Sequence, residues 1–212
     1  VTFSPDDSYV IFPGYTVLDG LPLRPRLYAV ASSGADAALT PQQLIDNGQL
    51  ISNKPATNIF SWDAAWSRGD CGGSYGDKLL ISTALQAPSP VGLQIDMLSG
   101  AKSNGLYTEN GSTLTQITDL GIIWATHPSW SKDCNKIVFI TREGTASDPA
   151  KSGVYVIDLT TASLPISSLS EDGVKLVHEC SPTSCPIGPA LFPSFTDDGS
   201  MSSTLREGRI SA

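Results

Sequence analysis

A repeat of about 64 residues is the feature that most constrains how this chain can fold. An aromatic residue followed by Ser or Thr, and then by an acidic or Gly-rich turn, occurs four times, and the aromatics lie 63, 64 and 65 residues apart. The four aromatics are Phe3, Trp66, Trp130 and Phe195. Four copies of one pattern at one spacing indicate a chain built from repeated structural units.

Further apolar segments recur with the aromatics and give each repeat the appearance of several short strands. In the first three copies the turn is followed by an apolar segment (YVIF, KLLIS, KIVFI). An alternating apolar segment then follows at Arg26–Ala31, Leu93–Leu98 and Val154–Leu159. A fourth strand is expected at Ser112–Thr118 and Val174–Glu179, whereas Pro41–Asp46 in the first repeat leaves a strand and a short helical turn both open.

The turns and the composition support an all-β fold. The 19 Gly and 15 Pro residues separate short apolar runs, which is typical of many strands and turns. In SPDD, SKDC and TDDG, Asp can cap backbone N–H groups and Gly tolerates positive φ, so we interpret the recurring carboxylates as turn caps. A lone four-stranded sheet buries too little apolar area, so we predict stacked units of about four antiparallel strands, as in a β-propeller.

The motif resembles the repeat of the TolB-like β-propeller family. Phe3–Phe12, Trp66–Ser82 and Trp130–Thr141 with Val154–Leu159 carry the resemblance, and Phe195–Leu205 carries it more weakly because MSST replaces the apolar strand. The chain departs from the family pattern where Arg68, Lys132 and Asp197 replace the proline kept at Pro5, where GGSYG is inserted in the second copy, and in its longer repeats. The resemblance implies a propeller that acts as a binding module, a scaffold or a gating domain.

The repeat divides the chain into blades 1–63, 64–127 and 128–192 and a partial fourth blade at 193–212, all within one propeller domain. Because propellers typically have 4–8 blades, three blades and a part predict an incomplete ring. We expect other residues, another domain or another chain to complete it.

Charge and motifs narrow the function. The net charge of −8 and the absence of a basic patch argue against nucleic-acid binding, and no apolar run is long enough to span a membrane. The sequence lacks a G-x-S-x-G elbow, a Walker loop and a C-x-x-C-H haem motif. We therefore expect a non-catalytic module for protein interaction or assembly.

Two alternatives stay open. One is a domain of a larger enzyme, either a propeller-gated hydrolase or a multihaem redox protein. The other is a glycan- or Ca²⁺-binding propeller. No cofactor is expected, although the Asp63–Asp77 segment holds three Asp without the EF-hand pattern and leaves Ca²⁺ open.

The family geometry implies a binding surface on the rim opposite the Ser-Asp turns. Long loops at Pro13–Pro25, Thr83–Val91, Asp119–His127, Thr141–Ser152 and Cys180–Pro189 would share that rim, and long loops are often functional. The candidate binding residues are Arg24, Arg26, Trp124, His127, Arg142 and His178. The alternative is that these loops fill space or contact a neighbouring domain. Trp62, Trp66, Trp124 and Trp130 are interpreted as core between blades.

Four cysteines suggest an oxidising compartment, either secreted or periplasmic. Cys180 and Cys185 lie in one Pro-rich loop, where a local disulfide, free thiols or a metal site are alternatives. A local disulfide would leave Cys71 to pair with Cys134. In the propeller interpretation these two cysteines occupy neighbouring turns, so their disulfide would join the second blade to the third.

Overall fold

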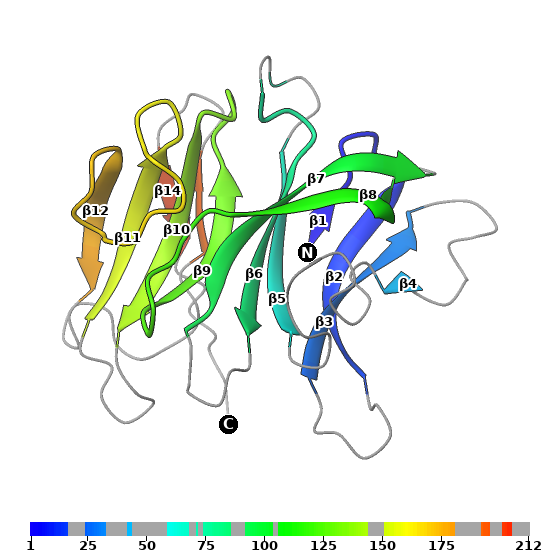
Figure 1. Ribbon diagram of the computed structural model, residues 1–212, viewed down its shortest axis with the longest axis horizontal. Helices are drawn as coiled ribbons and strands as arrows, with labels where there is room; N and C mark the ends of the chain where they lie inside the picture. The colour runs from blue at the N-terminus through cyan, green and yellow to red at the C-terminus, as the bar shows by residue number, and fades with distance from the viewer. Residues whose placement is uncertain are drawn as a thin grey trace.

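The computed structural model describes residues 1–16, 24–32, 42–43, 59–67, 71, 74–85, 92–103, 106–143, 151–180, 192–195 and 201–204. These residues form β-strands and connecting segments without any helix, and so include no helix that could cross a membrane (Figure 1). The strands are β1 (Thr2–Phe3), β2 (Tyr9–Thr16), β3 (Arg24–Ala31), β4 (Gln42–Gln43), β5 (Ile59–Trp66), β6 (Leu79–Leu85), β7 (Gln94–Ser103), β8 (Leu106–Gln116), β9 (Trp124–Trp130), β10 (Lys136–Glu143), β11 (Lys151–Asp158), β12 (Val174–Cys180), β13 (Phe192–Phe195) and β14 (Met201–Thr204).

The strands form three four-stranded sheets and one pair. Each four-stranded sheet follows chain order, as β1-β2-β3-β4, β5-β6-β7-β8 and β9-β10-β11-β12, and β13 pairs with β14. All of these pairings are antiparallel. Figure 1 shows the three larger sheets following one another across the molecule. The all-β class and the four-stranded units predicted from the repeat are therefore confirmed.

Several strands extend beyond the segments that the apolar pattern marks. The β2–β3 hairpin continues to the pair Thr16 and Arg24, and the β10–β11 hairpin to the pair Glu143 and Lys151. Parts of the predicted long loops are therefore strand, because backbone pairing between neighbouring strands does not need an apolar side chain at every position. Two other segments also pair: Gln42–Gln43 is a strand rather than a helical turn, and MSST forms β14 despite its polar sequence.

Two buried clusters hold successive sheets together. The first lies between the β1–β4 and β5–β8 sheets, and the second lies between the β5–β8 and β9–β12 sheets. The first contains Ile11, Leu27, Ala29, Trp66, Leu79, Ile81 and Leu98. The second includes Leu80, Ile95, Met97, Trp130, Ile137, Phe139 and Ile157. The sheet faces that meet at these two boundaries are therefore covered by a neighbouring sheet. A single sheet could not bury its apolar side chains in this way.

The aromatic residue that ends each first strand has the predicted packing role in two repeats. Trp66 and Trp130 are 7% and 8% exposed. The indole N–H of Trp130 donates to the carbonyl of Ala65 on β5 at 3.1 Å, and the backbone N–H of Trp66 donates to Thr2 Oγ1 on β1 at 3.2 Å. Each tryptophan therefore joins its own sheet to the preceding one.

Other aromatic residues differ from Trp66 and Trp130. Phe3 is 55% exposed, because no described sheet precedes β1 to cover it. Trp124 is 43% exposed at the start of β9, so its assignment to the core is wrong. The side chain of Trp62 lies outside the described residues.

The turns between the first and second strands repeat one hydrogen-bond design. Ser4 Oγ donates to Asp6 Oδ1 at 2.6 Å and accepts the N–H of Tyr9 at 3.0 Å. In the third repeat Ser131 Oγ donates to Asp133 Oδ1 at 2.6 Å and accepts the N–H of Lys136 at 2.9 Å. The interpretation of these two carboxylates as turn caps is confirmed, whereas Asp197 and Asp198 lie outside the described residues.

We expect the hydrogen-bonded carboxylate of Asp6 to make the stability of the fold depend on pH. Hydrogen bonds from Ser4 and Ser8 lower the pKa of Asp6 from 3.8 to about 2. A lowered folded-state pKa stabilises the fold above the unfolded value, and this stabilisation is lost as the pH falls from about 4 towards 2. The carboxylate is exposed, so solvent screening keeps the effect small.

Urea unfolding near pH 5 and near pH 2.5 tests this expectation. Asp6→Asn should lie below the wild type in stability at the higher pH, and the difference should narrow at the lower pH. A difference that stays constant with pH would contradict the assignment.

A buried side-chain network fixes the connection that leads into β9. Gln94 Nε2 donates to the carbonyls of Gly121 and Ile123 at 3.2 and 3.1 Å. Gln94 Oε1 accepts from Thr118 Oγ1 and from the N–H of Leu120, at 2.9 and 2.8 Å. Because buried polar groups are costly unless paired, these bonds specify one path for the connection and hence one position for the start of β9.

Candidate functional site

The first strands of all four units line one cavity of about 350 Å³. Residues of β1, β5, β9 and β13 contribute to its wall, together with Ser131 and Lys132 of the turn after β9. The wall includes Thr2 of β1, Ala65 of β5, Ser129 of β9 and Pro193 of β13. Segments that are far apart in the sequence therefore meet here because they hold equivalent places in the repeat.

Two ionisable residues occupy the same repeat position in this cavity. Asp63 and His127 each lie three residues before the tryptophan that ends their strand, Trp66 and Trp130. Both lie at a register irregularity, on β5 between Ser61 and Ala64 and on β9 opposite the shift from Val138 to Ile140. His127 also has a positive φ of 53°. A β-bulge redirects a side chain relative to a regular strand, so both irregularities contribute to the placement of this pair.

Asp63 and His127 join β5 to β9 across the boundary between two sheets. The backbone N–H of His127 donates to Asp63 Oδ2 at 3.2 Å. The ring atom Nδ1 lies 3.6 Å from the same oxygen and 3.1 Å from Thr126 Oγ1. The two side chains are only 18–19% exposed. The pair is therefore partly shielded from solvent while it lines a cavity.

Burial is the largest influence on the ionisation of both groups. It raises the pKa of Asp63, and the positive charge of His127 offsets part of this rise. Burial lowers the pKa of His127, which the Asp63 carboxylate partly offsets. Desolvation favours the neutral form of an acid and of a base alike, so the cavity favours a neutral imidazole. A positive charge nearby would stabilise the ionised form of the Asp63 carboxyl.

The imidazole provides a direct check on this pair. In Asp63→Asn the pKa of His127 should fall, because the variant removes the carboxylate that stabilises the imidazolium. NMR titration of the ring protons measures this change. The signals of the only other histidine, His178 on β12, are assigned separately so that the change is attributed to His127. An unchanged His127 titration would show that the two groups do not interact in solution.

No protein-family model, curated protein or solved structure matches the chain. The cavity and the repeat that builds it are therefore the basis for a functional proposal.

The residues predicted for the loop rim are distributed differently. Trp124 of β9 and Arg142 of β10 lie directly opposite each other at one end of their sheet, and both are exposed. His178 is exposed on the outer strand β12, opposite Val154. His127 instead belongs to the cavity.

The remaining rim candidates are described by their backbone alone. Arg24 and Arg26 pair with Thr16 and Gly14 in the β2–β3 hairpin, and their side chains lie outside the described residues. A binding role for the rim stays a prediction.

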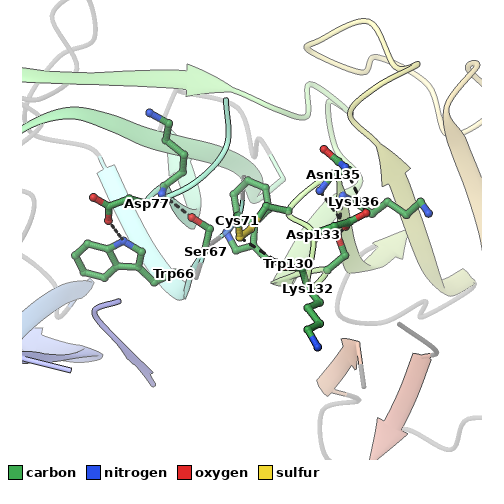
Figure 2. The surroundings of a disulfide bond; sticks show 12 residues. Trp66, Ser67, Cys71, Asp77, Trp130, Lys132, Asp133, Asn135 and Lys136 are labelled. Carbon is green, nitrogen blue, oxygen red and sulfur yellow. Dashed lines mark hydrogen bonds between the residues drawn. A yellow bond between two sulfur atoms is a disulfide. The ribbon is translucent and has the colours of Figure 1, made fainter. Parts of the chain in front are cut away.

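The predicted disulfide between the second and third units is present. Cys71 lies between β5 and β6, Cys134 lies between β9 and β10, and Figure 2 shows their bond beside Trp130. Their Cα atoms are 5.6 Å apart, within the range that a disulfide requires. Cys180 ends β12 and Cys185 lies outside the described residues, so their pairing stays a prediction.

The aspartates considered for Ca²⁺ are separated in the structure. Asp63 contacts His127, and Asp77 accepts the indole N–H of Trp66 at 3.0 Å (Figure 2). Asp70 lies outside the described residues. Within the described part of the chain no group of three or more His, Cys, Asp or Glu could hold a metal ion.

Asp63 is the functional candidate that sequence reasoning missed. The sequence places it in a Gly-rich segment with other acidic residues, which suggested only a weak cation site. The signal that could have found it is positional, because it lies as far before Trp66 as His127 lies before Trp130.

Proposed function

We propose that the chain is part of a TolB-like β-propeller that acts as a non-catalytic binding module, and that a segment of a protein partner enters the cavity between its first strands. The sheets described above would be three blades and the first two strands of a fourth. The Cys71–Cys134 disulfide and the low charge content support an oxidising compartment outside the cytoplasm.

The order of the strands supports the propeller. Each larger sheet is a meander of four antiparallel strands, and the first strand of each later unit packs against the preceding unit. Radial repetition of such sheets around a central channel defines a propeller. In that arrangement β1, β5, β9 and β13 would be the inner strands, and the cavity would belong to the channel.

One observation carries the functional proposal: four first strands converge on one cavity that contains a partly buried Asp–His pair. Concave sites with a few converging polar groups are the usual binding sites of proteins. The exposed Trp124 and Arg142, in contrast, lie on one sheet alone.

A displayed library of random peptides, selected on the purified chain, tests the proposal. Ser129→Trp places a large side chain on the cavity wall, at a half-buried strand position that tolerates aromatic residues. We expect the selected peptides to bind the wild type and to lose at least about tenfold in affinity for this variant.

The rim variant Trp124→Ala is the matched control, because it changes an exposed residue of the same strand outside the cavity. It should bind the peptides as the wild type does. Peptides that keep their affinity for Ser129→Trp and lose it for Trp124→Ala would place the site on the rim. A selection that gives no saturable binder would reject the binding module, and circular dichroism and thermal melting show that each variant is folded.

A further inference from the structure

Resting on this proposed function, we propose that the cavity binds a basic side chain of the partner, the ammonium of lysine or the guanidinium of arginine, with Asp63 as the anionic group that receives it. The inference names a ligand chemistry that a binding module alone does not specify. It depends on the charges at the cavity wall, on an acceptor of Asp63 that no described residue uses, on the neighbouring indoles and on the size of the cavity.

Charge favours a cation at this wall. Asp63 is the only carboxylate and Lys132 the only Lys or Arg among the described residues that line the cavity. The Lys132 side chain is exposed and is not among the charges that act on Asp63. An acidic ligand would instead bring a second carboxylate beside a partly desolvated one, which is unfavourable.

Asp63 has acceptor capacity that no described residue uses. Its Oδ2 accepts the backbone N–H of His127 and faces the imidazole, but Oδ1 has no hydrogen-bond partner among the described residues. An ionised carboxylate offers about four lone-pair positions across two oxygens. A lysine ammonium or an arginine guanidinium would use the remaining acceptors and would offset the desolvation of the carboxylate.

Two indoles complete an environment suited to a basic side chain. Trp66 and Trp130 both line the cavity, and their N–H groups are bound to Asp77 and to the carbonyl of Ala65. These hydrogen bonds fix the position of each ring through its N–H group. Lys and Arg bury their alkyl stems along apolar surfaces, and indole is the most favourable ring for a cation.

The size of the cavity suits a single basic side chain. The cavity holds about 350 Å³. A lysine or arginine side chain from an extended segment fits within this space.

NMR titration of the full chain with capped tripeptides tests the inference. The probes are acetyl-Gly-Lys-Gly-amide and its Arg, Gln and Glu counterparts. The Lys and Arg peptides should give saturable shifts at the amides of Ala64, Ala65 and Ser129, which line the cavity. The Gln peptide should bind at least about tenfold more weakly, because it lacks the charge.

Asp63→Asn should weaken binding of the Lys peptide by at least about tenfold. Asp158→Asn is the matched control, since Asp158 is an exposed carboxylate that caps Thr160 and is not part of the cavity wall. It should leave the affinity within about twofold. Retained binding of the Lys peptide to Asp63→Asn, or tighter binding of the Glu peptide, would overturn the inference.

A second measurement needs only the wild type and covers the case in which Asp63→Asn does not fold. The affinity for the Lys peptide should fall as the pH drops from about 7 to 4, because Asp63 and His127 both take up protons and the cavity wall becomes less negative. Lys132 is the other charged side chain among the described residues of this wall. Binding independent of pH would overturn the inference. Library peptides that lack basic residues but still lose binding to Ser129→Trp would also overturn it, and would leave the proposed function standing.

Discussion

Replacing both Cys71 and Cys134 by serine should lower the free energy of unfolding by about 4 kcal/mol. The disulfide closes a loop with a sequence separation of 63 residues. The chain-entropy model assigns roughly that stabilisation to a closed loop of this length, because the crosslink restricts the unfolded chain. For a chain of this size the melting temperature should fall by about 8–16 °C, measured by calorimetry or circular dichroism.

Two comparisons make this result specific. Cys180→Ser with Cys185→Ser should cost about half as much if these cysteines form the predicted local disulfide, because that loop is much shorter. A reducing agent should lower the melting temperature of the wild type towards that of the Cys71/Cys134 variant. A Cys71/Cys134 variant that melts within about 2 °C of the wild type would show that the bond does not restrain the unfolded chain.

Trp130→Ala should destabilise the fold by about 3–5 kcal/mol. The indole is 8% exposed within the cluster between the second and third sheets, and its ring lies 6.2 Å from that of Tyr75. The variant removes this buried area and also leaves the carbonyl of Ala65 without the hydrogen bond from the indole. Urea unfolding measures the loss.

The same strand provides the control. Trp124 is 43% exposed, so Trp124→Ala should change the free energy of unfolding by no more than about 1 kcal/mol. Trp130→Phe keeps an aromatic ring but removes the N–H donor, so it should lie between Trp130→Ala and the wild type. Equal effects of Trp124→Ala and Trp130→Ala would contradict the packing described for β9.

The repeat allowed much of the fold to be predicted, because one pattern determines strand order, turn chemistry and packing together. The spacing of Trp66 and Trp130 located two buried strand ends, and the position of Cys71 and Cys134 relative to them led to the correct disulfide. The serine and aspartate of SPDD and SKDC form the expected caps. These features are local or repeat every unit, so a single sequence contains them.

The candidate site was harder to predict, because it depends on irregular backbone and on contacts between units. A bulge has no distinct residue signal in the segment around Asp63, and a strand pattern alone placed His127 in a rim loop rather than on β9. Trp124 has the residue type of a core position but begins a strand, where no neighbouring element covers it. Pairing between strands also extends hairpins such as β10–β11 beyond their apolar residues.

The matched positions of Asp63 and His127 have a consequence for how such a protein can acquire specificity. The second and third units each present one ionisable side chain from this position, while Trp66 and Trp130, three residues later, are buried between the sheets and also line the cavity. One short segment of the repeat therefore contributes both to packing and to the chemistry of the cavity. A substitution of Asp63 or His127 would change the charge of the cavity and also the contact between β5 and β9. Changes of ligand preference at this position are thus linked to how two successive sheets are held together.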